Sequence, residues 1–509
     1  MNTSQRPAGV RAEHDSLEGY LTGVLSDEKL ARPLMVSFTQ WDFAIGAIAE
    51  TILTLKEMGS QPSLALWSDL TPVRDFGWQV DHRVASLLRS PSIDQRLRRA
   101  LRSAGVPKQW FVEPPIRRWS PQGELPAPTV TNRTSLRALE YRNSPLGRAL
   151  LQVHPDKNTP ITDDHLWPTK YVKAAIESYA FVFDQTCELI KKRGITSVIV
   201  YNGRFLHDSA VAAAAEAASL PILYYDFGGL DTDFDLTIDE THDWSALQGR
   251  MLRMYENWPA EERDELGSSW FEGRIGHTDP NNALYTGTQS IGLGIESVDD
   301  RPIAVYFSSS GDEISELDLD WSEYFFGQPE ALIAVSKACR AAGYTFVVRS
   351  HPHKRLKPKQ DLLDWLDAVA AAAPDVHLDP YSPVDSYTLM RQADVVITYG
   401  STTGVEAGFH GRPVIVMGPS AYDELGCATR VRTEQELLEA LSGTLVSSKQ
   451  GAIPYGLMMR RRGFVYRFVS RLPDGSRTLA GVPLVEAKPM VRHISHRLNR
   501  MRMSSLTRN

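Results

Sequence analysis

Apolar runs alternate with amphipathic stretches along much of this chain. The first cycle is an apolar run over 33–38, a helix-like stretch over 43–59 and a second apolar run over 62–69. Short apolar runs bounded by turn residues are typical of buried strands, and a strand, a helix and a strand in close succession form a βαβ unit. Such a unit implies a parallel sheet.

The alternation returns after a segment rich in arginine, proline and tryptophan. The pattern predicts a long helix over 169–193, then a strand with its exit loop over 195–204. An alanine-rich helix over 207–220 and a strand with its loop over 221–229 follow. The first half of the chain therefore carries at least two β/α units.

The pattern starts again at Arg301. Helix-like stretches separate further apolar runs, and in one of them Ser382 is the expected N-cap, with Pro383 at the first helical position. The predicted strands with their loops lie at 302–313, 344–353, 374–379, 394–401 and 412–418.

We therefore predict an α/β fold of two doubly wound Rossmann-like domains that face a cleft. Residues 1–31 are expected to be a flexible N-terminus, and 32–295 the first domain. Residues 296–455 are expected to form the second domain, and 456–509 a C-terminal helix and basic tail. A stretch rich in glycine, asparagine, threonine and serine marks the predicted exit from the first domain.

Composition narrows the class of protein. The net charge of −7 argues against nucleic acid as a partner, since such proteins carry a basic footprint. The three cysteines are scattered and fit neither a disulfide framework nor a zinc pattern. The N-terminus lacks the apolar core of a signal peptide, and no apolar run approaches the ~20 residues that span a bilayer. These features predict a cytoplasmic protein.

The last residues are strongly basic. Lys488 to Asn509 hold six Lys or Arg residues and no Asp or Glu. One interpretation is a solvated tail. The other is peripheral attachment to an anionic membrane surface, the inner face of the cell membrane, since each basic residue near such a surface contributes about 1 kcal/mol.

The loop after the 394–398 strand is the first candidate for chemistry. Gly400 permits a tight turn, and three hydroxyl residues, Ser401, Thr402 and Thr403, then stand where a helix begins. Hydroxyls together with unpaired backbone N–H groups favour a phosphate. Glu406, one turn on, is placed to accept bonds from ribose hydroxyls. Simple capping of the helix by Ser401 or Thr402 is the alternative.

Two more loops belong to the same predicted edge of the sheet. Arg349, His351 and His353 follow an apolar run, and a rigid, partly cationic loop stabilises a leaving phosphate. The loop after the 303–307 run offers a further wall of the donor site, or only a polar turn. Its candidate residues are Ser309, Ser310 and Gly311.

These residues carry a resemblance to a known family. The His-Pro loop, together with the "GSTTGVEAGFHGRPVIV" stretch, resembles the donor half of two-Rossmann (GT-B) glycosyltransferases of bacterial capsule and surface-polysaccharide synthesis. The likeness covers roughly residues 195–420. The same motifs recur in bacterial sialyl- and Kdo-type transferases and in poly(glycerol phosphate) polymerases.

The resemblance implies a function and residue roles. In those relatives both motifs hold the phosphate of a cytidine nucleotide. His351, Ser401 and Thr402 would then contact the donor phosphate, and Glu406 would face the ribose. The implied partners are a nucleotide-sugar donor and a glycan or glycolipid acceptor, with no cofactor beyond that co-substrate.

The acceptor hydroxyl needs a general base, which we expect on the first domain. Asp42 is the leading candidate, and His207 and Asp208 come next; a purely structural charge at a helix N-terminus is the alternative for Asp42. Asn202 and Arg204 are expected to bind acceptor or donor carboxylate, or to form a structural turn. No Asp-x-Asp lies beside a donor loop, so no metal is inferred.

Two further functions stay open at this point. A nucleotide-sugar epimerase shares the same architecture and also releases a nucleotide. A non-catalytic nucleotide-binding or scaffold protein is the other, if the acidic residues of the first domain are only structural.

Overall fold

A computed structural model describes most of the chain. The described residues are 16–38, 42–67, 73–74, 77–78, 93–113, 119–127, 133–151, 169–230, 232–279, 282, 286–296, 299–309, 327–356, 359–445, 447–472 and 476–484. Its contacts divide the chain into two compact units. The first combines Met1–Thr241 with Arg461–Asn509, and the second is His242–Arg460.

The first unit is built on a seven-stranded sheet. Its strand order is β15-β8-β7-β6-β1-β2-β5; the five strands from β7 to β5 are parallel, and β8 and β15 are antiparallel to their neighbours. The strands are β1 Pro33–Ser37, β2 Ser63–Leu66, β5 Phe111–Val112, β6 Ser197–Tyr201, β7 Ile222–Phe227, β8 Asp233–Thr237 and β15 Phe464–Val465.

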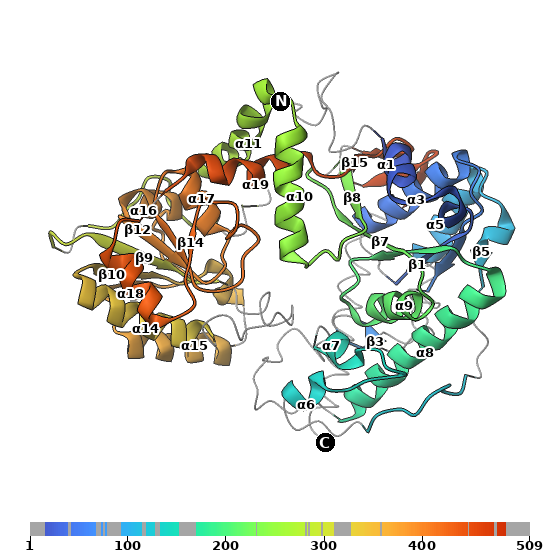
Figure 1. Ribbon diagram of the computed structural model, residues 1–509, viewed down its shortest axis with the longest axis horizontal. Helices are drawn as coiled ribbons and strands as arrows, with labels where there is room; N and C mark the ends of the chain where they lie inside the picture. Colours follow the sequence, from blue (N-terminus) through green and yellow to red (C-terminus); the bar gives the residue numbers. More distant parts are fainter. Residues whose placement is uncertain are drawn as a thin grey trace. The chain divides into compact units, whose positions relative to one another are not determined.

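Helices cover both faces of this sheet (Figure 1). Successive residues of a strand point to opposite faces of its sheet, so both faces of β6 are apolar. Val198 and Val200 share a core with helices α8 and α9, whereas Ile199 and Tyr201 share one with α1, α3 and α5. The described helices are α1 Leu17–Val24, α2 Asp27–Leu30, α3 Asp42–Glu57, α5 Ile93–Ser103, η1 Lys108–Trp110, α6 Arg133–Arg137, α7 Leu146–Leu150, α8 Thr169–Arg193 and α9 Leu206–Ala217. Small accessory sheets pair β3 Val73–Arg74 with β4 Gly77–Trp78, and β16 Val469–Arg471 with β17 Arg477–Leu479 and β18 Val482–Pro483.

The second unit is built on a six-stranded sheet in which every pair is parallel. Its order is β11-β10-β9-β12-β13-β14, which in sequence order reads 3-2-1-4-5-6. This is the doubly wound order of dinucleotide-binding folds. The strands are β9 Ile303–Phe307, β10 Thr345–Arg349, β11 Val376–Leu378, β12 Val395–Thr398, β13 Val414–Val416 and β14 Thr429–Arg430.

Helices also flank the second sheet (Figure 1). Tyr306, Phe346 and Ile397 share a core with α14, α15 and α18, while α17 packs on β12 and β13. The helices are α10 Trp244–Asn257, α11 Ala260–Ile275, α14 Gln328–Ala342, η4 Pro352–Leu356, α15 Lys359–Ala372, α16 Ser386–Gln392, α17 Thr403–Phe409, α18 Glu434–Ser442 and α19 Lys449–Arg461. The two Rossmann-like α/β units confirm the predicted fold class.

The boundary between the units differs from the predicted one near residue 295. Residues 242–295 belong with the second unit. The cause is packing: Phe271 of α11 stacks on Phe409 at 4.3 Å between ring centroids, and Gly267 approaches the backbone of Ile453 and Leu457 so closely that a Cβ would collide.

The N-terminal segment is not flexible throughout, as had been expected for residues 1–31. Residues 17–30 form α1 and α2, and Leu17, Tyr20 and Leu21 of α1 are buried in the core beside α3. Their spacing of three and four residues is that of one helix face, and Ser16 caps the helix by accepting a bond from the N–H of Gly19 at 2.9 Å. Residues 1–15 lie outside the described ranges.

The C-terminal segment does not simply continue as a helix and tail. After α19 the chain returns to the first unit, where β15 pairs with β8. A buried carboxylate holds it there: Glu50 of α3, 2% exposed, accepts the N–H groups of Arg467 and Phe468 at 2.8 Å and of Val469 at 3.3 Å. The basic stretch 488–509 lies outside the described ranges.

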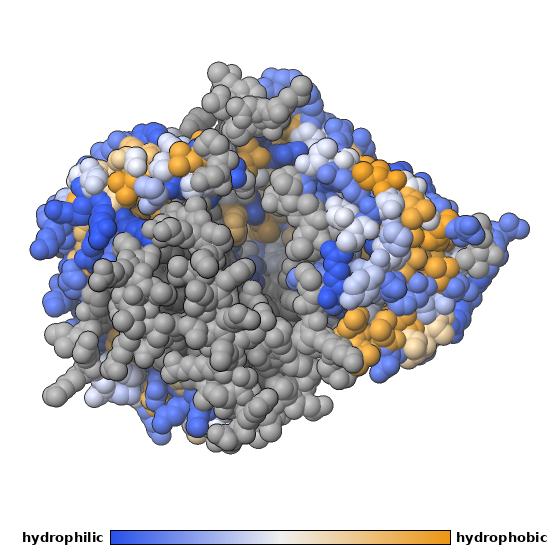
Figure 2. Space-filling view, turned by 180° about the vertical axis from the view of Figure 1, so that it is seen from behind, coloured by the Kyte–Doolittle hydropathy of each residue, from blue (hydrophilic) through white to orange (hydrophobic). Residues whose placement is uncertain are grey.

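No helix in the described part of the chain is both long and apolar enough to cross a bilayer. In the view of Figure 2 most of the described surface is polar, and apolar residues form a few separate patches on it.

The carboxylate of Glu50 generates a stability prediction. Glu50→Ala leaves three backbone N–H groups, of which that of Val469 is buried, without their acceptor, so we expect a loss of about 2–4 kcal/mol in the free energy of unfolding. Chemical denaturation measures that loss, and limited proteolysis should show earlier cleavage within 464–484.

Glu57→Ala is the matched control. Glu57 lies on the same helix and pairs with Arg467 of the same segment, but both side chains are about half exposed. Such a surface pair contributes about 0–1 kcal/mol. Equal losses in the two variants would contradict the anchoring role of Glu50.

Candidate functional site

Polar loops gather at one edge of the second sheet. Strands β9, β10 and β12 are parallel and adjacent in the order β10-β9-β12, so the residues that follow them emerge at the same edge. Successive strands are added toward one edge from β9 to β11 and toward the other edge from β12 to β14, so the order of winding reverses between β9 and β12. Ligands of doubly wound sheets bind at such a switch point, beyond the carboxyl ends of the strands.

The loop after β9 joins the two predicted motifs. Ser308 accepts the N–H of His351 on its Oγ at 2.8 Å, and its own N–H donates to the carbonyl oxygen of Arg349 at 3.1 Å. The next hydroxyl, of Ser309, donates to the carbonyl oxygen of Tyr399 at 2.9 Å. The His-Pro loop and the Ser/Thr loop, fifty residues apart in sequence, are thus tied to one pair of serines.

Gln328 supports this pair of serines, although it stands in no motif that predicts such a role. Its amide accepts the N–H of Ser309 at 2.9 Å and donates to the carbonyl oxygen of Ser309 at 3.2 Å. Gln328 stands at the start of α14 and is buried. The neighbouring candidates Ser310 and Gly311 lie outside the described residues.

The Ser/Thr turn has the backbone that the glycine predicted. Gly400 has φ +84°, and a Cβ there would overlap the carbonyl oxygen of Pro419. The N–H of Ser401 donates to Thr398 Oγ1 at 2.8 Å, and Ser401 Oγ accepts the N–H of Thr403 at 3.3 Å. Thr402 is the N-cap residue of α17 but makes no side-chain capping bond. The N-cap side chain of α17 therefore makes no capping bond, and Ser401 bonds the first helical residue from the position before the N-cap.

The two histidines of the His-Pro loop contact each other. His351 Nδ1 accepts the backbone N–H of His353 at 3.2 Å, and the ring centroids are 6.3 Å apart. When Nδ1 accepts, a neutral ring carries its proton on Nε2. A neutral His351 ring is therefore a hydrogen-bond donor at Nε2.

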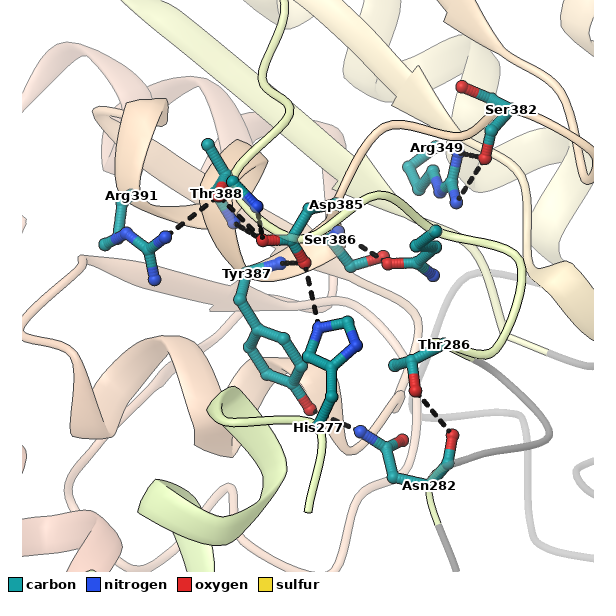
Figure 3. A network of polar contacts seen from close by, with 12 residues as sticks. His277, Asn282, Thr286, Arg349, Ser382, Asp385, Ser386, Tyr387, Thr388 and Arg391 are labelled. Carbon is teal, nitrogen blue, oxygen red and sulfur yellow. Dashed lines mark hydrogen bonds and ion pairs between the residues drawn. The ribbon is translucent and has the colours of Figure 1, made fainter. Parts of the chain in front are cut away.

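Arg349 lies beneath the loop. Its side chain is 2% exposed, and Nη1 and Nη2 donate to the carbonyl oxygen of Ser382 at 3.3 and 3.2 Å (Figure 3). Burial lowers its pKa to about 10, against the opposing effect of Asp379 and Asp385. The guanidinium thus holds the loop before α16, and its predicted contact with phosphate stays a prediction.

Glu406 has a partner that its position in the sequence did not reveal. Its carboxylate is buried and accepts Nε of Arg274, from the end of α11. Arg274 also approaches Asp279 at 3.5 Å and lies over the ring of Trp270 at 4.7 Å. Burial lowers the pKa of Arg274, but Glu406 more than offsets this and raises it above its ordinary value. The ribose role of Glu406 stays a prediction.

A second polar network lies in the same unit. Asp385 accepts Nε2 of His277 at 3.2 Å and also bonds the N–H groups of Tyr387 and Thr388 (Figure 3). Asp385 is therefore the N-cap of α16, whereas Ser382 had been expected. The physical reason is charge, because an ionised carboxylate binds the N–H groups of the first turn more strongly than a serine hydroxyl does. Asp385 also accepts the N–H of Gly292 at 3.2 Å.

The first unit has a switch point of its own, between β1 and β6. Asn202 follows β6 and has φ +52°, and its amide donates to Asp226 Oδ2 at 2.7 Å. Burial raises the pKa of Asp226, although the hydrogen bond from the N–H of Phe227 acts in the opposite direction. Asp226 follows Tyr225 on β7 and was not among the expected acids. An acidic residue at the end of an apolar run was the available signal.

The other candidates of the first unit are placed as follows. His207 and Asp208 lie in the first turn of α9 and are 3% and 2% exposed, and the His207 ring stacks on Phe38 at 4.8 Å between ring centroids. The guanidinium of Arg204 lies over the ring of Phe205 at 4.8 Å. Asp42 begins α3, but its side chain lies outside the described part.

Comparison with known protein families gives a match within the second unit. Residues 331–442 match the family described as "Capsule polysaccharide biosynthesis protein". This range includes both the His-Pro loop and the Ser/Thr turn, and it confirms the resemblance to capsule polysaccharide proteins inferred from their sequence. No curated protein matches the chain.

Three of the solved structures that this chain matches are the following. The β-Kdo 2,7 transferase KpsC of Thermosulfurimonas dismutans is 14% identical, with a TM-score of 0.34, over 58% of this chain and 86% of that one. The UDP-GlcNAc 2-epimerase of Neisseria meningitidis is 13% identical, with a TM-score of 0.26, over 84% and 96%. MurG of Acinetobacter baumannii is 12% identical, with a TM-score of 0.26, over 85% and 96%.

Gly400 generates the first prediction for this site. Gly400→Ala combines the left-handed backbone penalty of about 1–2 kcal/mol with a collision at Pro419, so the Ser401 turn must shift. We expect a lower melting temperature and loss of nucleotide binding, measured by thermal denaturation with and without nucleotide.

Gly411→Ala separates strain from collision. Gly411 has φ +71°, but nothing lies within 4 Å of the position of a Cβ. This variant should show the backbone penalty alone and retain binding. If both variants lose binding equally, the collision at Pro419 is not what shapes the turn.

His410 generates a prediction about pH. It follows α17, and burial lowers its pKa to about 4, with Arg391, Lys449 and Arg412 adding to the effect. The folded protein therefore keeps the ring neutral, while the unfolded chain protonates near pH 6.5. The contribution is complete above about pH 6.5 and is lost as the pH falls toward 4.

His410→Gln should abolish this part of the pH dependence. Urea denaturation between pH 4 and pH 7 should show a wild-type curve that falls more steeply, by on the order of 1 kcal/mol at the acid end after allowance for partial exposure. Parallel curves for the two proteins would refute the assignment.

Proposed function

We propose that this chain is a glycosyltransferase of bacterial capsule or surface-polysaccharide synthesis. It moves a sugar from a nucleotide-activated donor to a glycan or glycolipid acceptor. The observation that carries the proposal is the attachment of both motifs to Ser308 and Ser309 at the switch point of the second sheet. The family match over 331–442 supports it, because that range contains both motifs.

The proposed chemistry is departure of a phosphate leaving group. Bond cleavage at the sugar leaves negative charge on the phosphate, and donors already in place stabilise that charge. His351 offers Nε2–H, and Ser401, Thr402 and Thr403 offer hydroxyls on the adjacent loop. We favour a cytidine nucleotide, as the resemblance of these motifs implies, and a reaction without a metal.

A general base must remove the proton of the acceptor hydroxyl. The acids at the switch point of the first unit support that role, and we propose Asp208, His207 and Asp42 as its candidates, with Asn202 and Arg204 on the acceptor side. Asp226 joins them because it accepts the amide of Asn202 at the same switch point, and burial raises the pKa of its carboxyl group.

The proposed setting is the cytoplasmic face of the cell membrane. The basic stretch 488–509 supports attachment to anionic lipid, since it holds six basic residues and no acidic one.

Nucleotide binding tests the proposal. CMP or CDP should raise the melting temperature on the order of 5 °C at a hundredfold excess over Kd, and UDP and GDP should raise it less. His351→Ala should lose this shift. His410→Gln is the control, because His410 stands at the other end of α17 from the Ser/Thr turn and should retain it.

The outcomes separate the alternatives. Stabilisation by UDP or GDP alone would refute the cytidine donor. Turnover of a nucleotide-sugar without any acceptor would favour an epimerase, and binding without turnover would favour a scaffold. No stabilisation by any nucleotide would refute the proposed function.

A further inference from the structure

The Ser/Thr turn rests on another loop, residues 419–427, between β13 and β14. The hydroxyl of Tyr422, 1% exposed, donates to the carbonyl oxygen of Ser401 at 2.6 Å. Gly404 packs so tightly on Tyr422 that a Cβ would collide with its hydroxyl, and Gly400 is equally close to Pro419. The turn that carries the candidate phosphate ligands therefore takes its position from residues 419–427.

Helix α10 holds this loop through one side chain. Gln248 is 3% exposed, and its Nε2 donates to Asp423 Oδ1 at 2.9 Å. Its Oε1 accepts the N–H of Glu424 at 2.7 Å, and Nε2 lies 3.5 Å from the carbonyl oxygen of Ser420. Both ends of the amide are thus bound to the loop on either side of Tyr422.

Helix α19 contacts the loop from its own side. A Cβ at Gly451 would lie 2.7 Å from Leu425 O, Gly426 C and Cys427 N, so the helix backbone touches the loop backbone. Helices α10 and α19 lie next to the two places where the chain changes units, Thr241 to His242 and Arg460 to Arg461. Each of the two helices that contact residues 419–427 is therefore adjacent in sequence to one of the two connections between the units.

We propose that Tyr422 and Gln248 are positioning residues, which hold the Ser401–Thr403 turn in the geometry that binds the donor phosphate. This inference rests on the proposed function for the identity of the ligand, but not for the coupling itself. Neither residue belongs to the motifs that carry the family resemblance. Tyr422 contacts the turn directly through its hydroxyl, and Gln248 acts through the loop that contains Tyr422.

Two near-isosteric variants test the inference in the full-length protein. Tyr422→Phe removes only the hydroxyl, and Gln248→Met removes both polar ends of the amide at similar size. Each should weaken binding of the nucleotide that most stabilises the wild type, by roughly 5- to 20-fold for the loss of one or two buried hydrogen bonds. Isothermal titration calorimetry measures the Kd.

A second measurement needs no ligand. Amide hydrogen exchange of residues 399–405 should be faster in both variants, while strands β9 and β10 keep their protection. Tyr306→Phe is the matched control, because that hydroxyl is also buried in the second unit but has no hydrogen-bond partner in the structure. It should change neither the Kd nor the exchange of the turn.

The outcomes distinguish this inference from the proposed function. If no nucleotide binds the wild type, the proposed function fails, and the exchange of residues 399–405 alone decides the coupling. If nucleotide binds but both variants match Tyr306→Phe in Kd and exchange, the positioning role is overturned. Faster exchange spread evenly over the second unit would assign both side chains to general stability and would also overturn it.

Discussion

The second unit depends on the central position of β9 in an all-parallel sheet. Because β10 and β12 both pair with this strand, the loops that follow all three meet at one edge. The serine pair after β9 converts this adjacency into fixed geometry, since Ser308 bonds the His-Pro loop and Ser309 bonds the Ser/Thr loop. A different strand order would leave the same two motifs on separate parts of the sheet.

Local patterns in the sequence were sufficient to predict the parallel strands and the loops that follow them. The alternation of apolar and amphipathic stretches predicted the parallel strands, and the run of glycine and hydroxyl residues predicted the turn at Gly400, which has the positive φ that glycine allows. The convergence of His351 and Ser401 on neighbouring loops followed from the rule that ligands lie beyond the carboxyl ends of parallel strands.

Contacts between residues distant in sequence were not predictable in the same way. The pairing of Glu406 with Arg274 joins α17 to α11, and neither residue stands in a pattern that identifies the other. The boundary at Thr241 depends on aromatic stacking and close glycine packing, which a change in composition near residue 295 does not report. In contrast, the spacing of Leu17, Tyr20 and Leu21 is a local signal for the buried face of α1, because residues three and four apart share one side of a helix.

The return of the chain to the first unit has a consequence for how the protein is made. The second unit is one continuous stretch, His242–Arg460, whereas the first needs residues from both sides of it. Strand β15, the edge of the first sheet, and the backbone groups that satisfy Glu50 leave the ribosome only after the whole second unit has been synthesised. Since domains fold as units during synthesis, the second unit can complete its core while the first sheet still lacks its edge strand β15 and Glu50 still lacks its backbone donors.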